Sequence, residues 1–558
     1  MKYIYTTELP QHLNTQYPIY IDTETFGMTP LKHENIRLLQ IYQPNTEDTV
    51  YVVDVMLYPK EMLREYLSKF ENIFGYNLLY DWSVMGFTFQ TVPKYNDLYL
   101  ASKIAFYERF LNPITKWDLY SVLDYIGIKI DLDKKSMQTS NFAIQCLTDM
   151  QIKYSAYDVY YLPKLKESIE KLEPLIWTHN RVYRLDLFVS KSLLDIHKVG
   201  LQVNEELRQK ELNRVILELD NILQELSFNP LSPKQVSNFF KTHNADEKTL
   251  TLLASQGSEV AKKVLYARQL SKIKSFLEKY SGRVFGSFNV VGAKSGRMTS
   301  SNENLQQIPR QLRKVFGFNE ISNKTYVIAD FPQIELRLAG IIWNETEMIR
   351  AFKEGIDLHK YTASVIYKKD MNEITKQERQ IAKSANFGLL YGMGSDRFKD
   401  YIFINTGISL NNEETDLIKY NWFNLFKAIK MKHKEIGAYL KAYSQYSNIT
   451  WLGRKYCTTS YTEALNLQIQ GSGADLLKTT IKNILLKNYD VNYRIANIIH
   501  DEIIIETTKD IAKDVALMLK KEMENAWEEC INYSKLKLEN KFKLVCDMPD
   551  ITNTLEKS

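Results

Sequence analysis

The pattern of apolar and polar residues in the first 175 positions predicts a mixed α/β domain. Short apolar runs typical of buried strands alternate with segments in which apolar residues recur at helical spacing. The runs are residues 19–21, 36–42 and 50–53, and the helical segments include residues 61–70 and 98–106. Strands interleaved with helices favour a sheet covered by helices, so we expect one domain at residues 1–175.

A different pattern follows and predicts a helical arm and a second mixed domain. Residues 201–280 are polar with helical spacing, and Asn229-Pro230 and Ser232-Pro233 divide them into two antiparallel helices. Strand-like apolar runs return on either side of a long helical region at about residues 358–448. These runs are residues 326–329, 495–499 and 503–505.

Composition narrows the class of protein. The chain has 558 residues, 44% hydrophobic and 25% charged, which is too long for one core and ordinary for a globular protein. No apolar run approaches the roughly 18 residues of a membrane span, and the first residues resemble neither a secretory signal nor a transit peptide. The four scattered cysteines form no CxxC pair, which argues against a disulfide framework. We therefore expect a reducing compartment.

The formal net charge of +5 conceals two oppositely charged parts. Residues 1–180 hold 17 Lys and Arg against 22 Asp and Glu, whereas residues 181–558 hold 55 against 45. The first balance suits carboxylates around metal ions, and the second suits contact with a phosphate backbone. Seven of the cations lie in residues 262–283, among them Arg268 and Lys272. A solvated helix face is the common explanation of such a run, and a surface that follows phosphates is the alternative.

Acidic residues in the first domain have spacings that suit a metal site. Asp22 and Glu24 follow an apolar run and are two apart, so we expect both carboxylates on one face at the end of a strand. Asp81 stands near a helix start, and Tyr154 and Asp158, four apart, would share a helix face. Four carboxylates and a phenol can hold two divalent ions and orient a water for hydrolysis of a phosphodiester. Unrelated surface acids are the alternative.

Two further acids lie at strand ends in the second mixed domain. Asp330 follows residues 326–329, and Asp501 lies between two apolar runs, as at the tip of a hairpin. Two such acids brought together could hold paired magnesium ions that activate a hydroxyl and neutralise a triphosphate. Taken alone, either acid could belong to a solvated turn.

Between these acids lies a candidate nucleotide-binding helix. Arg379, Lys383, Phe387 and Tyr391 are each four apart, so each step turns by only about 40° and the four share a slowly winding face. Two cations followed by two rings suit a triphosphate with its base. Rings in the core and cations in solvent are the alternative for these residues alone.

Together these motifs resemble those of family A DNA polymerases, of the bacterial DNA polymerase I type in its large-fragment form. The acids and tyrosine of the first domain are similar to a DEDD-type 3′→5′ exonuclease signature with tyrosine in its third motif, and residues 135–140 resemble that family's proofreading domain. The resemblance spans roughly residues 17–510. The later segments that resemble family motifs are residues 295–300, 304–309, 330–337 (motif A), 379–392 (motif B), 466–475 and 500–502 (motif C).

The resemblance implies a fold and a function. The fold is multidomain α/β and α+β, with an RNase H-like exonuclease domain at residues 1–175 and a right-hand polymerase domain at residues 176–558. The implied subdomains are a thumb at about 200–285, a palm at about 286–345 and 450–558, and fingers at about 346–449. The implied activity is template-directed addition of dNTPs to a primer 3′ end by two-metal phosphoryl transfer, with 3′→5′ exonuclease proofreading.

The resemblance also implies roles for single residues. Asp22, Glu24, Asp81 and Asp158 would bind metal in the exonuclease, where Tyr154 would position the water, and Asp330 and Asp501 would bind metal in the polymerase. Arg379, Lys383 and His359 would contact the triphosphate, and Lys383 would also donate a proton to pyrophosphate. Glu335 would exclude ribonucleotides, Phe387 would pack on the nucleotide, and Tyr391 would lie near the template base. The implied DNA contacts are Arg297, Asn304, Gln306, Asn466, Gln470, His500, Arg268 and Lys272.

The implied cofactors are two Mg²⁺ ions at each site, for which Mn²⁺ can substitute. The implied partners are primer-template DNA and dNTPs, with a processivity factor or a helicase as candidate additions, and we expect a monomer. The implied location is the cytoplasm of a bacterial or phage-infected cell, with an organelle as the alternative. The chain departs from the family pattern at Phe331-Pro332, where Tyr-Ser is usual, and at Thr462, where the bacterial pattern has arginine. The first departure concerns a backbone carbonyl expected at a metal, and the second concerns one template contact.

Three other functions compete with this one. A stand-alone 3′→5′ exonuclease with a DNA-binding C-terminal part would need neither Glu335 nor the helix face of Arg379 and Lys383. A single-subunit RNA polymerase would share a similar helix but not the proofreading acids. A non-catalytic clamp would need neither set of carboxylates.

Overall fold

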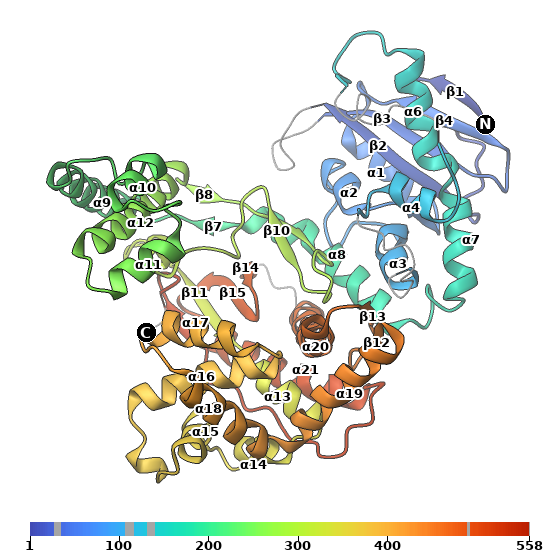
Figure 1. Cartoon of the computed structure of the whole chain (residues 1–558). Helices are drawn as coiled ribbons and strands as arrows, with labels where there is room; N and C mark the ends of the chain where they lie inside the picture. The colour runs from blue at the N-terminus through green and yellow to red at the C-terminus, as the bar shows by residue number, and fades with distance from the viewer. Residues whose placement is uncertain (27–34, 107–115, 131–139, 488–491, 557–558) are drawn as a thin grey trace.

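The computed structural model describes residues 1–26, 35–106, 116–130, 140–487 and 492–556 (Figure 1). Of the block at residues 135–140 that resembles a proofreading domain, all but Ser140 lies outside the described residues. Within the described ranges, no helix is both long enough and apolar enough to cross a membrane.

The first domain is a six-stranded sheet with helices on both faces. Its strand order is β1-β4-β3-β2-β5-β6, and β3 runs antiparallel to both β2 and β4. The strands are β1 Lys2–Thr6, β2 Ile19–Phe26, β3 Asn35–Tyr42, β4 Thr49–Asp54, β5 Ile73–Gly75 and β6 Tyr95–Asp97. The helices are α1 Lys60–Ser68, α2 Leu79–Val84, α3 Leu98–Ala105, α4 Leu119–Tyr125, α6 Asp149–Tyr160 and α7 Leu162–Leu172. The predicted strands and helices of this domain are therefore confirmed.

Alternation along β2 decides where its acids lie. Ile19 and Ile21 pack into a core with α1 and α2, whereas Tyr20 packs into the core that contains α6 and α7. Because alternate side chains of a strand share a face, Asp22 and Glu24 lie on the α6 side with Tyr20. The prediction that both acids end the strand is wrong, because β2 keeps pairing with β3 as far as Phe26.

Helix α8, Arg181–Val199, leads from the first domain to a helical arm (green in Figure 1). Two long helices, α9 and α12, pack against each other through buried Val215, Leu219 and Leu270. Two short helices, α10 and α11, join them, and a two-stranded ribbon of β7 and β8 forms the base. The bounds are β7 Leu201–Gln202, α9 Glu205–Glu225, α10 Pro233–Phe240, α11 Glu247–Ser255, α12 Glu259–Lys279 and β8 Arg283–Val284. The prediction of two long helices is confirmed, and the short pair was not predicted.

A second, antiparallel sheet lies at the centre of the molecule, with strand order β14-β15-β11-β16. Its strands are β11 Lys324–Asp330, β14 Tyr493–Ile499, β15 Glu502–Thr508 and β16 Asp550–Thr552, which confirms the three predicted runs. Three helices belong to the same domain, namely α13 Ile334–Ile342, α20 Tyr461–Lys487 and α21 Ala512–Asn532. The smaller elements are β9 Ser287–Asn289, β10 Thr299–Ser301, the 3-10 helix Arg310–Val315, β12 Tyr446–Ile449 and β13 Lys455–Thr458.

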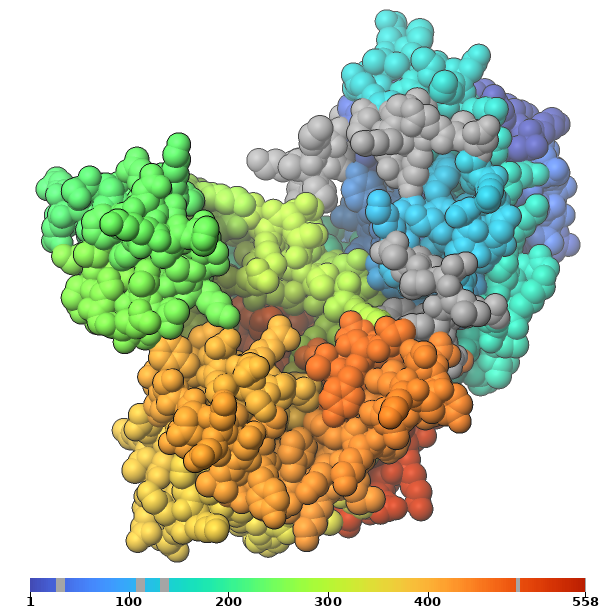
Figure 2. Space-filling view, viewed as in Figure 1, coloured from blue at the N-terminus to red at the C-terminus, as the bar shows by residue number. Residues whose placement is uncertain are grey.

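A helical lobe follows α13 and confirms the predicted long helical region. Its members are α14 Thr346–Lys353, α15 Leu358–Tyr367, the 3-10 helix Met371–Glu373, α16 Lys376–Leu390, α17 Ser395–Thr406, α18 Asn412–Leu425 and α19 Lys427–Tyr443. Figure 2 shows the surface hollowed between the green arm and the blue first domain, with the yellow-green segment that contains β10 between them. The lobe lies below this hollow in the same view.

Two candidate active sites

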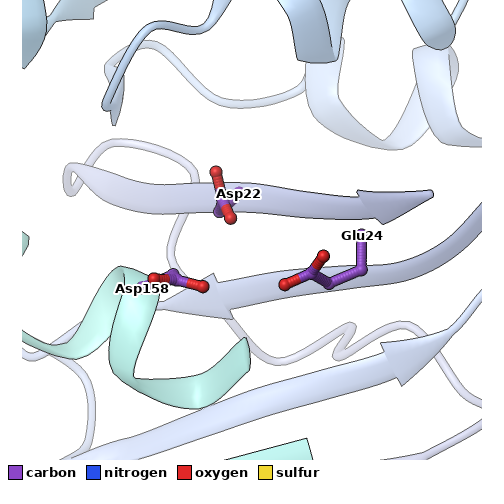
Figure 3. A group of neighbouring side chains, drawn as sticks. All are labelled: Asp22, Glu24 and Asp158. Atoms are coloured by element: carbon purple, nitrogen blue, oxygen red, sulfur yellow. The ribbon is translucent and has the colours of Figure 1, made fainter. Parts of the chain in front are cut away.

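Three carboxylates from two elements meet in the first domain. Asp22 and Glu24 lie on β2 and Asp158 lies on α6, and one oxygen of each falls within 4.8 Å of the others. In Figure 3 the carboxylates of Glu24 and Asp158 point toward each other beside Asp22. Asp22 and Glu24 are half-buried and Asp158 is buried. A group of carboxylate oxygens without nitrogen or sulfur is the ligand set that suits a hard divalent cation.

The buried acids of this cluster repel one another. Burial, followed by repulsion from Asp81 and Asp158, raises the pKa of Asp22 well above its usual value, and burial with the same neighbours raises the pKa of Glu24. Burial raises the pKa of Asp81 to about 7. A divalent cation would relieve this repulsion, so the residues present fit a metal site.

Asp81 joins the cluster from a second direction. It lies in the first turn of α2, buried, and its Oδ1 accepts a hydrogen bond of 2.6 Å from the Oγ1 of Thr23. Thr23 stands between Asp22 and Glu24 on β2 and faces the opposite side of the strand, so the strand that carries those two acids also holds Asp81 from its α2 side. Asp81 is electrostatically close to the cluster, although it is not one of the three mutually close ligands.

Tyr154 is one helical turn before Asp158 on α6, and both side chains are buried. The capping box of Thr148 and Gln151 fixes the start of this helix, which sets the direction in which both side chains leave it. Sequence reasoning missed a second phenol at this position. Tyr120 of α4 stacks on Tyr154, with ring centres 6.0 Å apart and planes 4° from parallel.

The second pair of acids is brought together by strand register. Asp330 is the last residue of β11 and lies opposite Glu502, the first residue of β15. Asp501 precedes Glu502 in the turn between β14 and β15, where His500 takes a left-handed φ of 57°. Burial raises the pKa of Asp501 to about 6, and the charge of Asp330 acts in the same direction. The acids predicted at two strand ends are therefore neighbours.

The departure at Phe331-Pro332 forms a tight entry to α13. Phe331 is buried, and the carbonyl of Pro332 accepts a 2.8 Å hydrogen bond from Nε of Arg337. Gln333 then takes a left-handed φ of 49° and caps the helix. The Pro332 carbonyl is thereby held by this chain's own arginine.

Three of the four predicted residues lie on α16 and the fourth, Tyr391, follows its last residue, and the four have different environments. Arg379 donates a 2.8 Å hydrogen bond from Nε to Oδ2 of Asp357, and Lys383 is exposed. Phe387 and Tyr391 are only partly exposed and line a cavity of about 410 Å³ together with Thr462.

His359 is placed differently from the expected contact with a triphosphate. The residue is only 3% exposed, and its Nδ1 lies 2.9 Å from Nδ2 of Asn386. Burial, helped by the charge of Arg379, lowers the pKa of His359 to about 4, so the ring is neutral. In this conformation the ring supports Phe387, with ring centres 6.0 Å apart, rather than offering a positive charge.

Glu335 connects the acidic pair to α16. Its Oε1 accepts a 2.6 Å hydrogen bond from Arg297, and its Oε2 accepts one of 2.5 Å from the hydroxyl of Tyr391. Both oxygens are therefore held, which fixes the carboxylate at the edge of the cavity that Phe387 lines.

The residues predicted to contact DNA are spread over several elements. Asn304 and His500 are exposed, and Gln306, Asn466 and Gln470 are partly exposed. The Oδ1 of Asn466 is buried and has no hydrogen-bond partner among the described residues.

The arm cations are mostly engaged within the protein. Arg268 donates to the carbonyls of Pro230 and Ala245, so its guanidinium holds the arm together instead of facing outward. Lys263 and Lys279 pair with Glu225 and Glu303. Lys272 is exposed and stays available for an outside anion.

Comparison with known proteins adds family matches. Residues 198–545 match the family model described as DNA polymerase family A, and residues 4–173 match the one described as 3′-5′ exonuclease. A DNA polymerase I of Aquifex aeolicus is 33% identical over 92% of this chain and 92% of its own length. Those of Chloroflexus aurantiacus and Borreliella burgdorferi are 27% and 26% identical, and this chain spans 44% and 61% of their lengths.

Among solved structures, the POL domain of Pol1 from M. smegmatis in complex with DNA primer-template and dNTP has a similar fold. Its TM-score is 0.78 at 18% identity, over 99% of both chains. At this identity the match concerns the fold.

Proposed function

Because the chain belongs to DNA polymerase family A and carries a 3′-5′ exonuclease domain, we propose that its two acidic clusters are the exonuclease and polymerase sites, respectively. The observation that carries this proposal is the position of the clusters. The group of Asp22, Glu24 and Asp158 lies inside the region matched to the exonuclease, and the pair Asp330 and Asp501 lies inside the region matched to the polymerase. The central sheet, the arm and the helical lobe then correspond to palm, thumb and fingers.

In the exonuclease site the carboxylates of Asp22, Glu24, Asp81 and Asp158 would hold Mg²⁺. Bound metal would supply charge stabilisation at the scissile phosphate and lower the pKa of a water. The hydroxyl of Tyr154, one turn from Asp158, would orient that water toward the phosphorus. The hydrogen bond from Thr23 of β2 gives Asp81 a fixed position before DNA binds.

In the polymerase site Asp330 and Asp501 would hold the metal that binds a dNTP triphosphate. Lys383 is exposed on α16 and would contact the phosphates and donate a proton to the departing pyrophosphate. Arg379 would add a guanidinium, which Asp357 already orients. His359 would act indirectly, because its buried ring supports Phe387 beneath the base.

Glu335 would select the sugar of the incoming nucleotide. Its carboxylate is held from both sides, so it cannot swing away from a 2′-hydroxyl. A desolvated carboxylate crowded by this hydroxyl would disfavour a ribonucleotide. Tyr391 would contribute by holding Glu335 while its ring lies near the template base.

Primer-template DNA would lie in the hollow between the arm and the first domain. Lys272 would contact phosphate, and Asn304, Gln306, Asn466, Gln470, His500 and Arg297 would contact the junction. The partnerless Oδ1 of Asn466 among the described residues supports a hydrogen bond to a bound group. Five further points stay predictions. They are two Mg²⁺ ions at each site, substitution by Mn²⁺, a monomeric state, a cytoplasmic location and a processivity partner.

The test separates the two activities in one chain. Asp330→Ala and Asp501→Ala should lower dNTP incorporation at least about 100-fold, because several kcal/mol of charge stabilisation is lost, and should spare degradation of a mismatched end. Asp22→Ala with Glu24→Ala should do the reverse. Asp416→Ala and Asp149→Ala, at exposed positions on α18 and α6, are matched controls. Incorporation near the parent rate in both polymerase variants would overturn the assignment.

A further inference from the structure

Tyr120 lies at the exonuclease cluster without belonging to any of its motifs. It is the second residue of α4, whose start is fixed by Asp118, the side chain of which accepts hydrogen bonds from the backbone and hydroxyl of Ser121. The short helix thereby directs Tyr120 at α6. The ring of Tyr120 lies nearly parallel to that of Tyr154 at 6.0 Å.

The hydroxyl of Tyr120 is directed at the metal-site acids. Its oxygen is buried, and the carboxylates of Asp158 and Asp22 lie within electrostatic reach of it. A phenol hydroxyl is a hydrogen-bond donor, so Tyr120 can donate to a carboxylate oxygen of the cluster. One side chain therefore stacks on the predicted water-positioning tyrosine and places its hydroxyl near a predicted metal ligand.

Simple ring packing does not explain this placement. A second stacked pair joins Tyr157 of α6 to Tyr161, the residue after its last turn, with ring centres 5.8 Å apart and planes 1° from parallel. That pair is partly exposed and lies beside Lys153 and Lys164 rather than beside acids. Stacking near α6 can thus occur at the surface, whereas Tyr120 places a buried hydroxyl within electrostatic reach of Asp158.

We propose that Tyr120 is a positioning residue of the exonuclease site, which aligns the phenol of Tyr154 through its ring and orients the carboxylate of Asp158 through its hydroxyl. The inference rests on the proposed role of this cluster. Groups that hydrogen-bond a ligating carboxylate fix which oxygen faces the metal, and removing such a group typically costs about 10–100-fold in activity or metal affinity.

The test compares Tyr120→Phe, which keeps the ring, with Tyr157→Phe, its matched control on α6. In the full chain, Tyr120→Phe should lower kcat for degradation of single-stranded DNA about 10–100-fold and leave KM within about twofold, because the lost contact orients groups that act in the reaction. Primer extension should not change. In Tyr120→Leu the kcat should fall further, because the ring that aligns Tyr154 is lost as well.

A second readout is metal binding without turnover. In a chain that also carries Asp330→Ala and Asp501→Ala, Mn²⁺ bound at the exonuclease cluster can be titrated by electron paramagnetic resonance. Tyr120→Phe should raise the Mn²⁺ dissociation constant about 10-fold, and Tyr157→Phe should leave it unchanged.

The outcomes distinguish this inference from the assignment on which it rests. Nuclease activity that survives Asp22→Ala with Glu24→Ala would overturn the site itself. Activity that is lost in that variant but stays within twofold of the parent in Tyr120→Phe, with unchanged Mn²⁺ affinity, would overturn only the role of Tyr120. An equal loss of nuclease activity in Tyr157→Phe would show that Tyr120 contributes only to packing.

Discussion

Asp186 and Arg454 form a doubly hydrogen-bonded ion pair that is buried between the first domain and the rest of the molecule. The two oxygens of Asp186 accept from the two terminal nitrogens of Arg454 at 2.8 and 2.9 Å. Lys478 of α20 donates to the same carboxylate at 2.6 Å, and Arg454 also pairs with Asp475. Asp186 lies on α8, the helix that follows the exonuclease domain, and Lys478 and Asp475 lie on α20. These contacts therefore tie α8 to the helix that carries Asn466 and Gln470.

Asp186→Ala should therefore destabilise the junction strongly. The change leaves two cations buried with only Asp475 beside them, and breaking a buried pair on one side typically costs about 3–5 kcal/mol. We expect a lower melting temperature in thermal unfolding of the full chain. Asp195→Ala, on the same helix but partly exposed, serves as comparison. Equal melting temperatures of the two variants would show that the pair does not stabilise the junction.

Glu335→Ala should relax the choice of sugar. Without the fixed carboxylate, the ratio of kcat/KM for a ribonucleotide to that for a deoxynucleotide should rise about 10–200-fold, since a single discriminating contact is typically worth 1–3 kcal/mol. Tyr391→Phe removes one of the two groups that hold Glu335, so its ratio should rise less. Single-nucleotide incorporation by the exonuclease-inactive chain measures both ratios. A larger rise in Tyr391→Phe than in Glu335→Ala would contradict the role of Glu335 as the selecting group.

The sequence predicted the parts of the two sites that depend on the regular repeat of side chains within one strand or one helix. Asp22 and Glu24 share a face because side chains alternate along a strand, and Tyr154 and Asp158 share one because four residues make about one helical turn. Contacts between distant elements have no such period. The bond from Thr23 to Asp81, the stack of Tyr120 on Tyr154 and the pair of Asp186 with Arg454 join residues 58, 34 and 268 positions apart in the chain.

The number of Lys and Arg residues in a segment does not show which of them bind DNA and which stabilise the fold, because that also depends on contacts between distant elements. The run at residues 262–283 contains both Arg268 and Lys272, but only the fold shows that Arg268 donates to arm carbonyls. Likewise, the end of β2 was placed too early because residues 22–25 are polar. Pairing with β3, which depends on a distant segment, extends the strand.

Lys272→Ala and Arg268→Ala should have different effects. Lys272→Ala removes one phosphate contact, so the slope of log affinity for duplex DNA against log salt concentration should become shallower by about 0.9. Its melting temperature should not change. Loss of Arg268 should lower stability, because hydrogen bonds to charged groups contribute about 1.5–3 kcal/mol. Salt titrations of DNA binding and thermal unfolding measure the two effects, and a salt slope unaffected by Lys272→Ala would exclude its contact with phosphate.

The metal-free exonuclease cluster should make the protein less stable as the pH rises. Burial raises the pKa of Asp22, Glu24 and Asp81 in the folded chain, to about 7 for Asp81, whereas unfolded carboxyls titrate near 4. Between these values the folded state binds more protons than the unfolded state, so the free energy of unfolding falls with rising pH, by up to about 1.4 kcal/mol per pH unit for each such group. With a chelator present, we expect the melting temperature of the full chain to fall from pH 5 to pH 7.

Metal ions should reverse this trend, because they bind the deprotonated carboxylates and stabilise the folded state by mass action. Adding Mg²⁺ at pH 8 should therefore raise the melting temperature more than at pH 5. Asp81→Asn should flatten the pH dependence in chelator, because an amide has no proton to lose, and Asp149→Asn at the exposed start of α6 should not. A melting temperature that rises with pH in chelator would mean that these carboxylates are not repelling one another in the folded chain.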